Sequence, residues 1–135
     1  MNEEDEEMEK EKMLKLDSDD ILRLMKGIDL TIKRWQRFKW GVPFSKMLRR
    51  QNCHLCVAVD EVNAHHGMWG HSCVACPWAL FVGGGDMCDY DIRIIRSAEN
   101  EKDFYDARDT VIGALLHLYD VYKVKHAYRK REEDN

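Results

Sequence analysis

Apolar side chains recur every three to four residues in two stretches of this chain, and each stretch predicts a helix with one apolar face. The first stripe consists of Ile21, Met25, Ile28, Ile32 and Trp35. Asp17 or Ser18 is suited to cap the start of this helix, since both side chains accept hydrogen bonds from unpaired backbone N–H groups. Gly41 and Pro43 then predict its end near Trp40.

The second stripe lies closer to the C-terminus and is longer. It consists of Phe104, Ala107, Val111, Leu115, Leu118 and Tyr122. Ser97 or Asn100 is expected to begin this helix, which should reach about Arg129. Two amphipathic helices that cannot bury their stripes alone most simply pack against one another. The sequence therefore predicts a mainly α fold, in which two long amphipathic helices form a hairpin.

The segment between the two helices, residues 53–96, has no such periodicity. Gly67, Gly70 and the glycines at 83–85 predict turns, and residues 78–82 and 92–95 each predict a short strand. A short helical turn is expected over residues 44–50. We interpret residues 53–96 as an irregular cap across the open end of the hairpin.

Two Cys-x2-Cys pairs lie in this cap. Cys53 pairs with Cys56 and Cys73 with Cys76, and sixteen residues separate the two pairs. Four thiolates in two close pairs supply the ligands of a tetrahedral Zn²⁺, and this spacing is typical of structural zinc sites. Such a set leaves no coordination position for water or substrate. The predicted zinc is therefore structural, and it compensates for the core that this segment cannot build.

Other ligands and other chemistry compete with this assignment. Cys88 and His71 are possible substitutes for one of the four cysteines, because zinc accepts a Cys3His set equally well. If it binds no metal, Cys88 is expected to be a small buried apolar residue. The neighbouring His54, His65 and His66 could also replace a cysteine, but His65 and His66 lie in a polar, glycine-flanked loop and are interpreted as surface imidazoles. An iron–sulfur cluster, a disulfide framework and unligated thiols remain as alternatives, although five cysteines leave one unpaired.

The enzymatic alternative is a metal-dependent nuclease of the HNH type, a family that also frames its site with two Cys-x2-Cys pairs. Asp60, His65 and His66 resemble its Asp/His-His motif, in which a histidine is the general base. Only six residues separate His66 from Cys73, too few for the strand-to-helix crossover of that family. The residue after Cys76 is also a proline, where that family has His or Asn. The sequence therefore favours a non-enzymatic role.

Charge is unevenly distributed along this chain of net charge −4. Residues 1–16 form an acidic tail with too little apolar surface to fold, so the predicted domain spans 17–130 and residues 131–135 form a polar end. An acidic start does not fit a secretory signal, and no stretch is long and apolar enough for a membrane span. We therefore expect a cytoplasmic protein without membrane contact, whose cysteines stay reduced.

Basic residues gather at the end of the first helix, where residues 33–50 contain no acid. They are Lys33, Arg34, Arg37, Lys39, Lys46, Arg49 and Arg50. Trp35, Phe38, Trp40 and Phe44 are interleaved with them. Cations neutralise phosphates and exposed rings stack on bases, so this segment is a candidate surface for nucleic acid or a host protein. Trp35 lies on the apolar stripe and is expected in the core. For Trp40 and Phe44, at the helix end, burial in the core and stacking on a base are both open.

A second basic cluster lies in the last helix. It consists of Lys123, Lys125, Arg129, Lys130 and Arg131. An antiparallel hairpin with an offset first helix would bring the two clusters together.

The cysteine pattern as a whole resembles that of a group of small phage proteins. The shared elements are Asn52-Cys53-x2-Cys56, Cys73-x2-Cys76-Pro77, the glycines at 84 and 85, Cys88 and a long terminal helix. The resemblance covers roughly residues 50–120 and excludes the acidic tail and the first helix. The resemblance implies a viral origin and a location in the host cytoplasm, but it implies no particular activity.

Taken together, these features predict a small, zinc-stabilised helical protein of phage type that acts as a non-enzymatic binding module. Its expected partner is nucleic acid or a host protein, bound through residues 33–50. The HNH-like nuclease and a structural virion or scaffold component are the alternatives.

Overall fold

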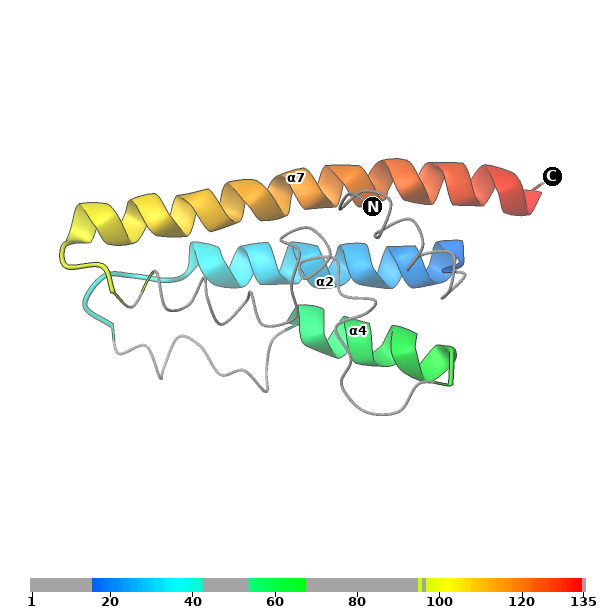
Figure 1. Ribbon diagram of the computed structural model, residues 1–135, viewed down its shortest axis with the longest axis horizontal. Coiled ribbons are helices and arrows are strands. Elements are labelled where there is room, and N and C mark those ends of the chain that lie inside the picture. Colours follow the sequence, from blue (N-terminus) through cyan, green and yellow to red (C-terminus); the bar gives the residue numbers. More distant parts are fainter. Residues whose placement is uncertain (1–15, 43–53, 68–94, 96, 135) are drawn as a thin grey trace, which may run out of the picture.

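The computed structural model of the chain describes residues 16–42, 54–67, 95 and 97–134. Its helices are α2 (Ser18–Gln36), α4 (His54–His65) and α7 (Glu101–Asp134). Helix α2 lies in the middle and packs against both α7 and α4 (Figure 1). The described residues include no strand, so the predicted mainly α fold is confirmed for this part of the chain. Within it, none of the helices combines the length and the apolar character of a membrane span.

Helix α2 begins with a reciprocal cap at Asp17, one of the two capping residues that the sequence predicted. The side chain of Asp17 accepts a hydrogen bond from the backbone N–H of Asp20 at 2.8 Å. The side chain of Asp20 in turn accepts one from the backbone N–H of Asp17 at 3.2 Å. Two N–H groups that the first helical turn leaves unpaired are satisfied in this way. The helix ends at Gln36, and Gly41 beyond it has a positive φ of 86°.

Helices α2 and α7 run antiparallel and are joined by hydrogen bonds at both ends (Figure 1). At the start of α2, the backbone N–H of Ser18 donates to Glu133 Oε1 at 2.9 Å, and the Ser18 hydroxyl donates to the other carboxylate oxygen. Beyond the end of α2, Arg108 donates from Nη1 to the backbone carbonyl of Phe38 at 3.1 Å. The predicted hairpin of two long helices is therefore confirmed.

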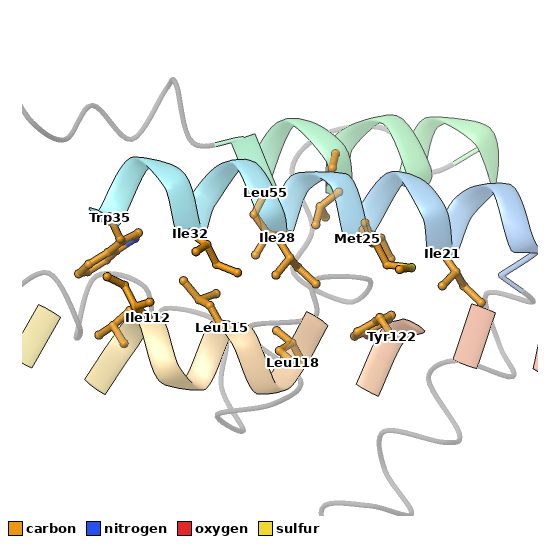
Figure 2. Close-up of a cluster of buried hydrophobic side chains, with 14 of the residues drawn as sticks. Ile21, Met25, Ile28, Ile32, Trp35, Leu55, Ile112, Leu115, Leu118 and Tyr122 are labelled. Atoms are coloured by element: carbon orange, nitrogen blue, oxygen red, sulfur yellow. The ribbon is translucent and has the colours of Figure 1, made fainter. Parts of the chain in front are cut away.

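The two predicted apolar stripes meet between these helices. Figure 2 shows Ile28 of α2 close to Leu118 of α7, and Ile32 close to Leu115. Ile28 is 0% exposed and Leu118 is 1% exposed. Burial of an aliphatic side chain of this size contributes about 1.5–3 kcal/mol to folding, so the shared stripe is the main source of stability in the pair. Trp35 is part of this core, as expected.

Helix α7 begins where the sequence placed it but ends later than predicted. Asn100 is its N-cap residue, since its side-chain oxygen accepts a hydrogen bond from the backbone N–H of Asp103 at 2.8 Å. The helix continues past Arg129 to Asp134, so residues 131–134 of the predicted polar end are helical. Their extension is fastened by the contact between Glu133 and Ser18.

Helix α4 was not predicted, and the interpretation of residues 53–96 as irregular is wrong for residues 54–65. Leu55, Val59 and Val62 form a short apolar stripe and are at most 4% exposed. They pack against the side of α2 where Gly27 lies, and a Cβ atom at Gly27 would come within 2.8 Å of Ala58 Cβ. The absence of a side chain at Gly27 therefore permits close approach of the two helices.

The predicted strands and turns fall largely outside the described residues. The segment 78–82, the glycines at 83–85 and the turn expected at 44–50 all lie there. Ile95, the last residue of the predicted strand 92–95, is helical and 2% exposed. The strand interpretation is therefore wrong at this residue, which contributes its side chain to the helical core.

Candidate functional site

The cysteine site predicted from the sequence lies almost entirely outside the described residues. Cys53, Cys73 and Cys76, with the substitutes Cys88 and His71, all belong to segments that are not described. The backbone of Cys56 lies in the first turn of α4, where an irregular loop was expected. The four-cysteine zinc site therefore stays a prediction.

A different cluster of metal-binding residue types lies where the end of α4 meets the start of α2. His65 Nδ1 is 2.9 Å from Asp20 Oδ1, and His66 Nε2 is 2.8 Å from Asp20 Oδ2. One ligand atom from each of the three residues lies within 4.8 Å of the other two. The two imidazole rings meet edge to face, with centroids 4.9 Å apart. The two oxygens of the Asp20 carboxylate thus each contact one of two consecutive histidines.

The backbone on both sides fixes this cluster. Asp20 is the third helical residue of α2, and the cap with Asp17 orients its carboxylate. His65 ends α4, and the backbone N–H of His66 is bonded to the carbonyls of Val62 and Asn63 at 3.3 and 3.1 Å. Both histidines are therefore presented from ordered backbone, in line with the preference of functional sites for rigid elements.

The carboxylate of Asp20 is buried while the imidazoles are more accessible. The Asp20 side chain is 2% exposed, against 20% for His66 and 50% for His65. A buried carboxylate requires partners that offset its lost hydration. Among the described residues, its polar contacts are the N–H of Asp17 and the two imidazoles, and none of them comes from Lys or Arg. The helix N-terminus adds a partial positive charge.

Sequence reasoning missed this cluster. It interpreted His65 and His66 as surface imidazoles or as part of a nuclease motif, and it did not connect either of them with Asp20. The structure adds that both histidines contact Asp20, whereas Asp60, the acid suggested by the nuclease motif, is exposed on α4. A consecutive His-His pair at the end of a short apolar stripe was the available signal. Its acidic partner lies 45 residues earlier and could not be read from local spacing.

The other candidate site is the basic and aromatic segment at the end of α2. Its described residues, which we call the α2-end surface, are Lys33, Arg34, Arg37, Lys39 and Trp40. Lys33 forms an ion pair with Asp29 at 3.0 Å. Asp29 precedes the acid-free stretch of residues 33–50. Arg37 and Lys39 are exposed and Arg34 is partly buried. The remaining members, Lys46, Arg49 and Arg50, lie outside the described residues, as does Phe44.

The aromatic residues of this segment divide into two kinds. Trp35 is 7% exposed and Phe38 is 1% exposed, so both belong to the core, as expected for Trp35. Trp40 is 42% exposed. Its ring meets Phe104 edge-on at a centroid distance of 5.8 Å, and its backbone N–H donates to the Tyr105 hydroxyl at 3.3 Å. Trp40 therefore contacts α7 and is still partly accessible to solvent.

The second basic cluster does not meet the α2-end surface. Lys125 and Arg129 line a hollow together with Leu16 and Ile21, at the start of α2. The α2-end surface lies at the other end of the same helix, next to Phe104 and the first turns of α7. The antiparallel arrangement separates the clusters by most of the length of α2 (Figure 1).

Comparisons with known proteins give no match: no protein family, curated protein or solved structure matches the chain. The resemblance to small phage proteins therefore stays a prediction.

Proposed function

We propose that this chain is a non-enzymatic binding module that contacts nucleic acid through the α2-end surface. The observation that supports it is Trp40, an aromatic residue that is 42% exposed and follows the exposed cations Arg37 and Lys39. A tryptophan ring at an accessible position beside cations offers a flat face on which a nucleic-acid base can stack.

The charge distribution favours single-stranded nucleic acid over duplex. A sequence-tolerant single-strand site combines cations along a backbone track with a ring on which a base stacks. The net charge of −4 and the pairing of Lys33 with Asp29 argue against a broad coat of positive charge along a duplex. The α2-end surface offers a local site, extended in sequence by Lys46, Arg49 and Arg50.

Fluorescence anisotropy with a labelled single strand of about 12 nucleotides tests the proposal, since this length is within the range of such sites. Trp40→Ala should weaken binding roughly 5- to 150-fold, as expected for the loss of one stacked base. Trp40→Phe should retain most of the affinity. Replacing both Arg37 and Lys39 by Ala should reduce the salt dependence of binding, by about 0.7 in log–log slope for each phosphate that is no longer neutralised.

The matched control is the basic cluster at the opposite end of the hairpin. The double variant Lys123→Ala and Lys130→Ala removes two exposed cations as well, but far from the α2-end surface. It should leave the affinity close to that of the unmodified chain. Equal losses in both double variants would show that only total charge matters, and no binding by the unmodified chain at low salt would refute the proposal. In that case a host protein becomes the favoured partner.

We also propose that a structural zinc holds the cysteine segment, with Cys53, Cys56, Cys73 and Cys76 as ligands. The support is the spacing of the two pairs, which matches structural zinc sites. Thiol titration checks it: only Cys88 should react before chelation, and all five cysteines should react after it. Five reactive thiols before chelation, or iron with visible absorbance, would contradict the zinc assignment.

A further inference from the structure

We infer that Asp20, His65 and His66 form a binding site for a first-row divalent metal ion such as zinc, distinct from the cysteine site. The site joins the C-terminal end of α4 to the first turn of α2, two segments that lie side by side in Figure 1. It does not rest on nucleic-acid binding by the α2-end surface.

The donor set has the composition that such a metal requires. Imidazole nitrogens and a carboxylate oxygen are the usual ligands of Zn²⁺ outside thiolate sites. The three donor atoms lie within 4.8 Å of one another, and the carboxylate oxygens are 2.8–2.9 Å from the nitrogens that face them. A small outward movement of the rings is enough to admit an ion that each donor contacts at about 2.0–2.2 Å. Three protein ligands leave at least one position for water.

The charge balance around Asp20 also favours a cation. Its carboxylate is 2% exposed, yet its contacts among the described residues are two imidazoles and one backbone N–H. Without a metal, each ring nitrogen that faces the carboxylate has to carry a proton, because a carboxylate only accepts hydrogen bonds. A divalent ion replaces both protons and supplies a permanent positive charge beside the carboxylate.

The geometry further provides a rigid anchor and a route of entry. The reciprocal cap with Asp17 fixes the carboxylate, as an outer contact fixes a metal ligand. The side chain of His65 is 50% exposed, so solvent reaches the cluster from that side. A metal bound here would connect the C-terminal end of α4 to the start of α2. It would therefore limit movement of α4 away from α2.

The full-length protein is first given one equivalent of Zn²⁺ to occupy the cysteine thiolates, and is then titrated with Co²⁺ to test the inference, because cobalt absorbs visible light and reports its ligands. Binding to nitrogen and oxygen donors should give visible bands without the near-ultraviolet charge-transfer band of cobalt thiolates. Asp20→Asn, His65→Gln and His66→Gln should each weaken this binding at least 10-fold, since even outer-shell changes cost 10- to 100-fold. Their amide groups preserve hydrogen bonding, and circular dichroism without metal checks the fold. His126→Gln, on α7, is the control and should bind Co²⁺ as the unmodified chain does.

A second measurement needs no substitution. In the unmodified protein with ¹⁵N-labelled histidine, Zn²⁺ should shift the ring signals of His65 and His66 and leave those of His117 and His126 in place. Loss of the thiolate-free cobalt signal in the three variants, with these two rings shifted by zinc, supports the site. Unchanged cobalt binding in all three variants, or no shift at His65 and His66, overturns it.

Discussion

Single residues carry the contacts that position α2 between its two partners. Asp20 closes the cap of α2 and also holds His65 and His66, so one carboxylate serves the helix start and the contact with α4. Gly27 acts by having no side chain. A Cβ atom there would lie 2.8 Å from Ala58 Cβ and 3.2 Å from the backbone oxygen of His54, closer than ordinary contacts. The sequence alone could not predict that Asp20 and Gly27 both contact α4.

Gly27→Ala should therefore destabilise the protein. Alanine is favoured over glycine in a helix by about 1 kcal/mol, but overpacking of a tight contact costs about 1–3 kcal/mol and has to displace α4. We expect a net loss of about 1 kcal/mol in the free energy of unfolding, measured by urea denaturation. In a double-mutant cycle, Gly27→Ala should cost less in an Ala58→Gly background than in the unmodified chain.

Gly113→Ala in α7 is the matched control. Nothing lies within 4 Å of a Cβ atom at this position, so only the helical preference acts. This change should stabilise the protein by about 0.5–1 kcal/mol. If Gly27→Ala stabilised the protein to the same extent, the close contact between α2 and α4 would be disproved.

At the scale of whole elements, long stripes with recognisable caps could be predicted and the short helix could not. The periodicity of α2 and α7, with caps at Asp17 and Asn100, indicated both helices and their pairing. Helix α4 has only Leu55, Val59 and Val62 as its main apolar positions. Its first turn also contains a cysteine that the zinc pattern had assigned to a loop. The candidate metal cluster depends on where α4 ends beside α2, so it could not be predicted without that helix.

The pairing of α2 with α7 includes one pH-dependent contact. Hydrogen bonds from the hydroxyl and the backbone N–H of Ser18 hold the pKa of the Glu133 carboxyl below its ordinary value. A carboxyl whose pKa is lower in the folded state stabilises that state fully above its unfolded pKa, about 4.3 for glutamate. This stabilisation disappears as the pH falls from there through the lower folded-state value.

Glu133→Gln should consequently lower the melting temperature at about pH 7, and its effect should be smaller at about pH 3, below the unfolded pKa of glutamate, because the stabilisation is lost as the carboxyl becomes protonated. Thermal unfolding followed by circular dichroism at both pH values measures the difference. Glu132→Gln is the control, because Glu132 pairs with Arg129 and not with Ser18. An equal effect of Glu133→Gln at both pH values would mean that its contact with Ser18 is not made by the carboxylate.

At the scale of the whole molecule, α2 separates two candidate sites. The Asp20 cluster lies at its start, and the α2-end surface begins in its last turn with Lys33 and Arg34 and continues beyond its end. At a rise of about 1.5 Å per residue, roughly 20 Å of helix separates Asp20 from Lys33. Helix α7 spans this distance and supports both ends, through Glu133 at Ser18 and through Phe104 and Tyr105 at Trp40. Metal binding at one end therefore need not change the contacts at the other.

The measurement that tests the proposed function most directly is a titration of ¹⁵N-labelled protein with a single-stranded oligonucleotide, followed by amide and indole NMR signals. We predict that the largest shifts fall on residues 33–42 and on the indole N–H of Trp40. The core indole of Trp35 and the amides of residues 123–131 should change little. Shifts that centre on residues 123–131, or no shifts at low salt, would contradict the proposal that the α2-end surface binds nucleic acid.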